Sequence, residues 1–390
     1  MNAASPSLRP RVAIVHDWLT LTGGAERVLA QMLELYPEAD LFCAVCFRSE
    51  QVERLLNGRS VRTSFVQRLP FARKRYRGYL PLMPFAVEQF DLSAYDVIIS
   101  SSHAVAKGVI TGPDQVHLAY VYSPIRYAWD LQHTYLREAK LTRGLRSWLA
   151  RAVLHYMRLW DLRTAPGVDH FIGISHFIRR RIAKVYRREA EVIYPPVDVE
   201  RFVVGTERED FYVTASRMVP YKHIPLIAAA FAKMPDKRLV IIGDGPERAL
   251  VEAAAGPNVL LAGFLDDEAV ADHFRRARAF VFAAEEDFGI VPLEAQACGT
   301  PVIAYGAGGS LETIRGEGSA APTGLFFAEQ TVDSIVDAVR RFEALEPPID
   351  AGACRTNAER FGNERFRSAL SASVDRAFAA LRSDREQVFD

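Results

Sequence analysis

The sequence has few cysteines and no long apolar run, and both absences limit what the protein can be. Four cysteines in 390 residues are too few and too scattered for a disulfide framework. No apolar run approaches the length of a membrane span, and the polar start, residues 1–10, lacks the apolar core of a signal peptide. We therefore expect a cytoplasmic protein.

The rest of the composition describes an ordinary globular chain, with 49% hydrophobic and 25% charged residues. A length of 390 residues is too great for one hydrophobic core and suggests two domains. A lone Cys-x-x-Cys pair, Cys43 and Cys46, lies inside an apolar segment that is typical of a buried strand. Core packing explains this pair better than metal or redox chemistry, because no second pair accompanies it.

The formal net charge is zero, but the two halves of the chain differ. Residues 1–195 hold 27 Lys and Arg against 17 Asp and Glu, and the remainder holds 21 against 31, which gives net charges of +10 and −10. This asymmetry suggests that only the first half meets an anionic surface.

Short apolar segments alternate with helical patterns in both halves, which is typical of parallel sheets covered on both faces. Pro195 and Pro196 end the last predicted strand of the first half. We therefore predict an α/β protein with one domain over 1–200 and a second over 201–365. We expect the remaining segment, 366–390, to be helical.

One stretch of the second half combines a strand, an acidic turn, a short helix and another strand. We predict strands over 279–283 and 301–305, and between them a helix that begins near Gly289 and ends at Gly299. The first amides of such a helix have no partner within it, and its dipole gives this end a partial positive charge. A phosphate group is the natural ligand of this turn.

Two carboxylates bracket the turn, Glu286 ahead of the helix and Glu294 within its first turns. A carboxylate accepts hydrogen bonds from two hydroxyl groups, which suits sugar and ribose rings on either side of a bound phosphate. An acidic helix start would account for Glu286 alone but not for Glu294. Their spacing, followed by Gly-Thr-Pro-Val-Ile-Ala, resembles the Glu-x7-Glu signature of retaining glycosyltransferase family 4, whose members have the GT-B fold.

This resemblance implies two Rossmann-like domains with the active site in an interdomain cleft. It makes 1–200 the acceptor-binding domain and 201–365 the nucleotide-sugar-binding domain, and it implies that the helix over 366–390 packs back on the first domain. It implies that Glu286 holds the hydroxyl groups of the donor sugar and that Glu294 holds the ribose. Phe288, Gly289 and Ile290 belong to the donor-binding turn in this interpretation.

A second candidate site follows the predicted strand over 211–215. Arg217 offers a planar fork of donors and Lys222 a compact charge, which together fit a diphosphate clamp and match the Arg-Lys loop of the family. The loop around Leu265 lies against the nucleobase in the family. The acidic pair that follows could suggest a metal, but an N-cap at Asp266 explains it more simply. We expect no metal and no cofactor.

In the first half, Gly23 and Gly24 precede a helix and let the backbone approach a ligand closely, although a plain tight turn would use the same residues. The resemblance places these glycines near the diphosphate and the acceptor. His103 follows a predicted strand at the edge where open parallel sheets bind ligands. In the family a His at this place contacts the donor sugar.

An acceptor site is predicted in the loop after the next strand. Arg126, Tyr127, Trp129 and Asp130 combine a cation, two aromatic rings and a carboxylate, which fits a wall for a sugar acceptor. A packed loop would use the same residues, and the two interpretations stay level.

Two stretches without any acidic residue, 54–87 and 140–160, mix Arg and Lys with aromatic and leucine side chains. This mixture suits an anionic lipid interface. RNA binding would use similar residues, but no nucleic-acid motif accompanies them. We expect attachment to the inner face of the plasma membrane.

The motifs together most resemble bacterial mannosyltransferases that build O-antigen or exopolysaccharide on a polyprenyl-diphosphate carrier. The expected donor is GDP-mannose and the expected acceptor is a lipid-linked saccharide; the same chemistry with a UDP-sugar is the alternative. A dinucleotide oxidoreductase is disfavoured because Gly243-Asp244-Gly245 is an incomplete glycine fingerprint. A non-catalytic, two-lobed sugar-binding protein would not need Arg217, Lys222 and both glutamates.

Overall fold

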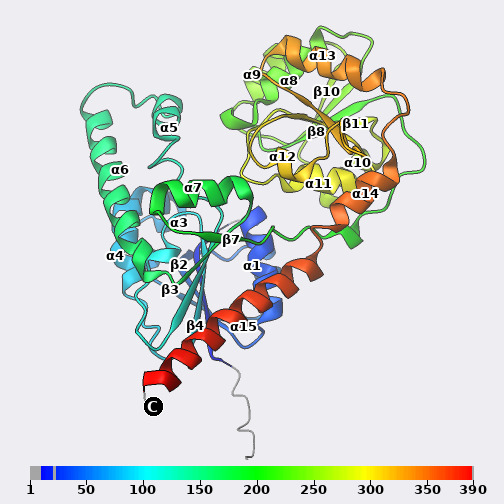
Figure 1. Ribbon diagram of the computed structural model, residues 1–390. Coiled ribbons are helices and arrows are strands. Elements are labelled where there is room, and N and C mark those ends of the chain that lie inside the picture. The colour runs from blue at the N-terminus through cyan, green and yellow to red at the C-terminus, as the bar shows by residue number, and fades with distance from the viewer. Residues whose placement is uncertain (1–9, 21–22, 389–390) are drawn as a thin grey trace, which may run out of the picture. The chain divides into compact units, whose positions relative to one another are not determined.

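The computed structural model describes residues 10–20 and 23–388, and it forms two compact units (Figure 1). Unit 1 contains the described residues up to Ile193 together with those from Phe366 onward, and unit 2 runs from Tyr194 to Arg365. The boundary thus falls a few residues before the predicted one at position 200. Residues 1–9, which make up most of the polar start considered above, lie outside the described part.

Unit 1 is built on a seven-stranded parallel sheet with the order β3-β2-β1-β4-β5-β6-β7. Its strands are β1 (Val12–Leu19), β2 (Asp40–Cys46), β3 (Val61–Thr63), β4 (Val97–Ser102), β5 (Val116–Val121), β6 (His170–Gly173) and β7 (Ala190–Val192). Its helices are α1 (Gly24–Leu35), α2 (Glu50–Leu56), α3 (Ala72–Arg75), α4 (Met83–Glu88), α5 (Gln132–Glu138), α6 (Leu145–Thr164) and α7 (His176–Tyr186). The inner strands β4 and β5 are buried along their whole length, as expected for a sheet covered on both faces.

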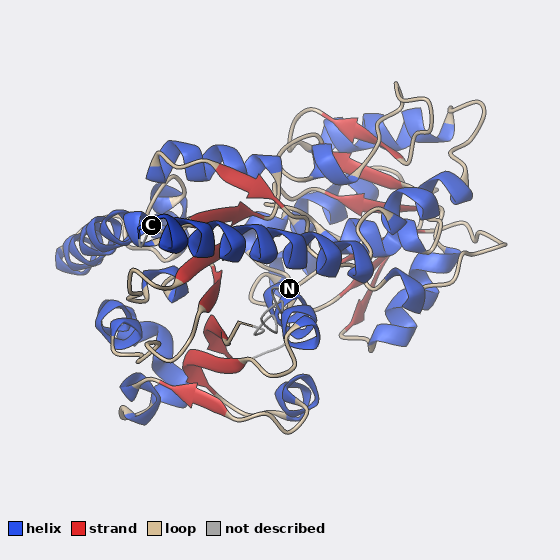
Figure 2. Ribbon diagram, turned by 60° about the horizontal axis from the view of Figure 1, so that its bottom comes forward, coloured by secondary structure: helices blue, strands red, loops and turns tan. Residues whose placement is uncertain are grey.

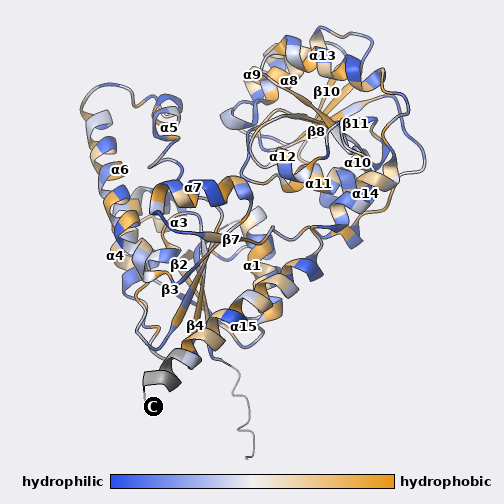
Figure 3. Cartoon of the chain, in the orientation of Figure 1, coloured by the Kyte–Doolittle hydropathy of each residue, from blue (hydrophilic) through white to orange (hydrophobic). Residues whose placement is uncertain are grey.

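Unit 2 repeats this architecture with a six-stranded parallel sheet of order β10-β9-β8-β11-β12-β13. Its strands are β8 (Tyr212–Ala215), β9 (Leu239–Ile242), β10 (Val259–Gly263), β11 (Ala279–Phe282), β12 (Val302–Tyr305) and β13 (Gly324–Phe327). Its helices are α8 (Ile224–Ala232), α9 (Arg248–Ala254), α10 (Asp267–Arg276), α11 (Ile290–Ala297), α12 (Ser310–Thr313), α13 (Val332–Glu343) and α14 (Ala351–Glu359). Figure 3 shows the apolar colour concentrated on the strands and on the helix faces turned toward them.

In each sheet the strand order reverses beside a central strand, at β1 and β4 in unit 1 and at β8 and β11 in unit 2. Loops that leave the carboxyl ends of these strands diverge to opposite faces of the sheet, and the space between them is where open parallel sheets bind ligands. The fold therefore directs attention to the residues that follow β1, β4, β8 and β11.

The last helix, α15 (Asn363–Val388), lies along unit 1 against α1, β5 and β7 (Figures 1 and 2). The Phe366 ring packs edge-on against Tyr120, with ring centroids 5.7 Å apart. Arg367 donates to Glu34 at 2.6 Å, and Arg376 donates to Glu191 at 2.8 Å. These contacts make the end of the chain part of unit 1.

Several local predictions are confirmed. Asp266 is an N-cap, as predicted, and its carboxylate accepts from the Ala269 amide at 2.8 Å. Ser175 caps α7 in the same way, and its Oγ accepts from the Ile178 amide at 3.1 Å. The Cys-x-x-Cys pair lies in β2, and all four cysteines are buried and unbonded to one another. Burial raises the pKa of the Cys43 thiol well above its ordinary value, so this thiol is unreactive.

Two elements of unit 2 were not predicted, the edge strand β13 and helix α14. β13 has only four residues and follows a stretch of small residues and proline, 316–323, which gives no helical or alternating pattern. Among the described helices, none combines the length and the apolar character needed to cross a membrane.

Candidate functional site

The carboxyl edge of the sheet in unit 1 brings Asp17, near the end of β1, next to His103, which follows β4. The Asp17 carboxylate is fully buried and accepts four backbone hydrogen bonds: Oδ2 from the amides of His103 and Ala104 at 2.6 and 3.0 Å, and Oδ1 from those of Val105 and Ala106 at 2.6 and 2.7 Å. Sequence reasoning missed Asp17. The available signal was an acidic residue directly inside an otherwise apolar strand.

The His103 ring lies beside this carboxylate, with Nδ1 3.0 Å from Asp17 Oδ2. The ring packs edge-on against Trp18, with centroids 4.6 Å apart, and about a third of the side chain is exposed. Burial is the largest single influence and favours the neutral ring, but the contact with Asp17 and the negative charges of Asp17 and Glu26 together outweigh it and raise the pKa of His103. The predicted ligand-binding His therefore stands at a strand end, partly open, and tends toward the cationic form.

The glycine pair lies on the same edge, where Gly23 is the N-cap residue and Gly24 the first residue of α1. The Gly23 amide donates to Glu26 Oε2 at 2.9 Å, so Glu26 satisfies one of the open donors of the helix start. Glu26 Oε1 also lies 3.9 Å from His16 Nε2. The predicted glycine turn is thus confirmed as a helix start, and two further buried ionisable groups adjoin it.

Several side chains of the predicted acceptor loop contact other residues of unit 1. The Trp129 indole N–H donates to Asp161 Oδ2 at 2.7 Å, and Asp130 accepts from Arg181. Tyr127 packs edge-on against Tyr135, with ring centroids 6.1 Å apart. These contacts support the packed-loop interpretation for Trp129, while Arg126 and Tyr127 remain partly exposed.

In unit 2 the predicted clamp loop follows β8 at the carboxyl edge of the sheet. The Arg217 side chain is exposed, and Lys222 ends a short 3₁₀ turn, Pro220–Lys222, in a half-buried position. The Lys222 ammonium pairs with the Glu286 carboxylate, which stands in the turn after β11. The structure therefore joins Lys222 and Glu286, which are 64 positions apart in the sequence, into one charged pair.

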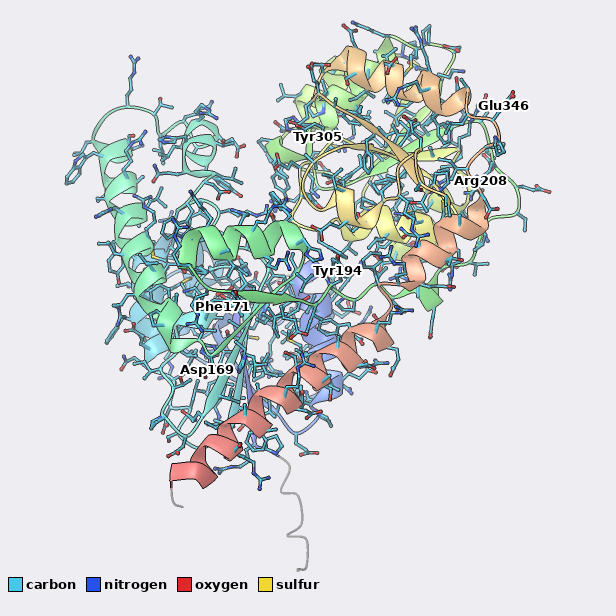
Figure 4. The ribbon with its side chains drawn as sticks, in the orientation of Figure 1. Asp169, Phe171, Tyr194, Arg208, Tyr305 and Glu346 are labelled. Atoms are coloured by element: carbon cyan, nitrogen blue, oxygen red, sulfur yellow. The ribbon has the colours of Figure 1, made fainter. Side chains whose placement is uncertain are left out.

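The turn after β11 leads into α11 as predicted. Gly289 is the N-cap residue with φ of +94°, a backbone conformation that favours glycine, and no side chain caps the helix start. Glu294 is 7% exposed, within α11. The Phe288 ring is buried and stacks on Tyr194, with centroids 5.7 Å apart, so its backbone rather than its ring is available to a ligand (Figure 4 labels Tyr194).

The glycine-rich turns after β9 and β12 pack closely against the loops that carry the candidate residues. A Cβ on Gly243 would lie 2.0 Å from the Ser216 carbonyl oxygen, next to Arg217. A Cβ on Gly308 would lie 2.4 Å from the carbonyl oxygen of Glu286. The turn after β12 therefore lets the backbone approach the Glu286 turn closely.

Leu265 is half-buried in the loop between β10 and α10, beside the exposed Phe264 and the capping Asp266. Within the described residues no cluster of three or more His, Cys, Asp or Glu side chains could hold a metal ion. Arg217, Lys222 and the start of α11 are positive groups of unit 2 that follow strand ends and could meet a phosphate.

Comparison with known families accounts for both units. A profile described as Glycosyltransferase Family 4 matches residues 22–201, and one described as Glycosyl transferases group 1 matches residues 197–361. The chain belongs to glycosyltransferase family 4. Its α/β architecture is the GT-B fold, which confirms the predicted fold class.

Curated relatives of this family 4 member are distant. It is 30% identical over 253 residues to a D-inositol 3-phosphate glycosyltransferase of Mycobacterium avium, covering 58% of this chain and 57% of the relative. It is 30% identical over 218 residues to a GDP-mannose-dependent monoacylated alpha-(1-6)-phosphatidylinositol monomannoside mannosyltransferase of Corynebacterium glutamicum, covering 48% and 55%. The match thus spans little more than half the length of these relatives.

Solved structures resemble the family 4 chain over nearly its whole length. Anabaena Alr3699/HepE in complex with UDP and glucose superposes with a TM-score of 0.68 at 17% identity, covering 94% of this chain and 99% of that one. The lipopolysaccharide outer core galactosyltransferase WaaB superposes with a TM-score of 0.61 at 16% identity, covering 93% and 99%. At such identities the likeness establishes the fold.

Proposed function

We propose that the protein is a retaining glycosyltransferase that moves mannose from GDP-mannose to a saccharide carried on a polyprenyl diphosphate, in the synthesis of a bacterial surface polysaccharide. The observation that carries the reaction class is the Lys222–Glu286 pair, which joins a cation for the diphosphate to a carboxylate for the sugar beside an uncapped helix start. The Corynebacterium relative, named as GDP-mannose-dependent, supports the choice of donor. UDP-sugar is the second candidate, favoured by the complexes of HepE with UDP and UDP-glucose.

In this mechanism the bond between the anomeric carbon and the diphosphate breaks, and the acceptor oxygen bonds to that carbon on the same face. The acceptor proton passes to an oxygen of the departing phosphate, so no enzymic nucleophile takes part. Arg217, Lys222 and the amides that begin α11 stabilise the charge that grows on the diphosphate. His103 contacts the donor sugar, and Glu294 contacts the ribose.

The donor must displace one charged contact to bind in this way. Lys222 and Glu286 neutralise each other, with 13% and 18% of their side chains exposed. A sugar hydroxyl at Glu286 and a phosphate oxygen at Lys222 would replace the direct ion pair with two charge-assisted contacts. Lys222 would therefore contact the phosphate, and Glu286 the sugar, only when the donor is bound.

Nucleotide release from a panel of sugar nucleotides tests the reaction and its independence of metal. We expect release of GDP from GDP-mannose in the presence of a lipid-linked acceptor, and the same rate after treatment with EDTA, because basic groups and a helix start supply the positive charge. Release from UDP-sugars alone would favour the second donor. Loss of activity with EDTA that magnesium or manganese restores would contradict the metal-independent mechanism.

The protein acts, in this proposal, in the cytoplasm at the inner face of the plasma membrane, where the lipid carrier of the acceptor resides. Unit 1 exposes large apolar side chains next to cations: Phe71 is 74% exposed beside the basic helix α3, and Phe85 is 57% exposed. Along α6, apolar residues at a spacing of three and four face outward, including Leu145 at 81% and Trp148 at 67% exposure. Such side chains suit the headgroup region of an anionic bilayer.

Vesicle sedimentation tests this attachment. Replacing Arg73, Lys74, Arg75 and Arg77 with Ser is expected to weaken binding to anionic vesicles at low salt, because each basic residue near the surface contributes about 1 kcal/mol. The matched control removes three exposed cations of α7, Arg179, Arg180 and Lys184, and the exposed Arg187 that follows the helix as its C-cap. If the two variants bound equally, overall charge, and not the stretch around α3, would account for attachment to the vesicles.

A further inference from the structure

The buried Asp17 carboxylate is the strongest polar feature of unit 1 that the reaction above does not use. It has no exposed surface, and four consecutive amides, those of residues 103–106, converge on its two oxygens. A carboxylate that accepts this many backbone hydrogen bonds stays ionised. Accordingly, although burial alone would raise it, the pKa of Asp17 lies below its ordinary range because the His103 ring carries charge 3.0 Å away and the His103 amide donates to the carboxylate.

These contacts fix both the backbone and the ring of His103. The four amides belong to the turn that leaves β4, so Asp17 sets the path of the chain at the ligand-binding edge of the sheet. The same carboxylate lies 3.0 Å from Nδ1, and Trp18 packs edge-on against the ring. Among the described residues no partner is recorded for Nε2, the other ring nitrogen.

The charges around the ring come from every element that packs against it. Asp17 and Glu26 are negative and favour the charged ring, while Arg126 opposes it and burial opposes it most. His16 and Tyr122 face the ring with centroids 6.4 and 6.3 Å away. Asp17 is the negative group in direct contact with the ring, and together with Glu26 it outweighs the opposing effects on the pKa of His103.

We propose that Asp17 is a positioning residue that turns Nδ1 of His103 toward its own carboxylate, holds the ring in the cationic form, and so presents an Nε2–H donor to the anionic sugar donor. This inference rests on the proposed function, in which His103 contacts that ligand. A cationic ring attracts the diphosphate and donates to a sugar oxygen, whereas a neutral ring presents one nitrogen as an acceptor. The protonated state is kept below the raised pKa of His103 and is lost as the pH rises through it.

Histidine titration by NMR tests the state of the ring without any transfer reaction. In the unmodified chain with ¹⁵N-labelled histidine, His103 is expected to titrate above the ordinary value of about 6.5. In Asp17→Asn the midpoint is expected to fall by about 1–3 pH units, the usual effect of removing an adjacent opposite charge. Asp91→Asn, which removes an exposed carboxylate of the same unit, is the control and should leave His103 unchanged.

A midpoint at or below the ordinary value in the unmodified chain would overturn the inference, and this measurement does not depend on whether the variant folds. An unchanged midpoint in a folded Asp17→Asn would overturn it as well. In the transfer assay, kcat/KM of the unmodified chain should decline as the pH passes the His103 midpoint, and Asp17→Asn should move that decline to lower pH. Absence of any transfer, with the expected titration, would reject the proposed function and leave the Asp17–His103 assignment standing.

Discussion

Replacement of Lys222 by alanine is expected to lower the rate of glycosyl transfer about 10²–10³-fold, the usual effect of removing one preorganised donor that stabilises developing negative charge. The Lys222 ammonium is held in place by Glu286 on one side and by the Phe282 ring, 5.7 Å away, on the other. It therefore meets the diphosphate with little reorganisation. Stability should fall by more than for a solvent-exposed pair, because only 18% of the Glu286 side chain is exposed and its carboxylate loses its counter-charge.

The measurement compares kcat and the affinity for nucleoside diphosphate between Lys222→Ala and a matched variant, Lys233→Ala. Lys233 also pairs with a carboxylate of unit 2, that of Asp333 at 2.9 Å, but lies on an exposed surface. We expect Lys233→Ala to retain full activity. If both variants were equally active, the ion pair with Glu286 would be a structural contact and the assignment of Lys222 to the diphosphate would fail.

Most strands of both units could be predicted because they are short apolar runs bounded by polar residues. In a parallel sheet covered on both faces every position of an inner strand is buried, so the run needs no alternation to be recognised. The helix starts at Asp266 and Gly289 could be predicted for a local reason too, since capping residues act within three positions. Candidate residues at strand ends followed from the same reasoning.

The contacts that shape the site could not be predicted, because they join residues distant in the sequence. Asp17 receives hydrogen bonds from amides 86–89 positions later, and no local pattern pairs it with them. Gly308 is glycine because the carbonyl of Glu286 lies against it, a close approach that only the folded chain reveals. Trp129 looked suited to an acceptor wall, but its indole N–H is turned to Asp161, 32 positions away.

Asp161 is the centre of a buried charged network in unit 1, and its neutralisation is the largest stability effect that we expect. The Lys107 ammonium lies 2.9 Å from Asp161 Oδ1 and also donates to the Asp161 carbonyl and to Thr164. Tyr186 donates to the same carboxylate, as does the Trp129 indole. Burial lowers the pKa of Lys107, and the adjacent carboxylate is what opposes that effect.

Asp161→Asn should therefore lower the free energy of unfolding of unit 1 by about 3–5 kcal/mol, the cost of leaving a buried ammonium without its counter-charge. Urea unfolding followed by tryptophan fluorescence reports on this unit selectively, because all four tryptophans, at positions 18, 129, 148 and 160, belong to it. The control is Glu50→Gln, which breaks the exposed Glu50–Arg54 pair of α2 and should cost about 0–1 kcal/mol.

A double replacement separates the charge effect from a general loss of packing. Lys107→Met together with Asp161→Asn removes both charges. The double variant should therefore lose less free energy of unfolding than the sum of the losses of the two single variants. Additive losses would show that Lys107 and Asp161 stabilise unit 1 independently. If Asp161→Asn were as stable as Glu50→Gln, the network would be contradicted. Neutralising a buried carboxylate with three side-chain partners should cost more stability than breaking an exposed ion pair.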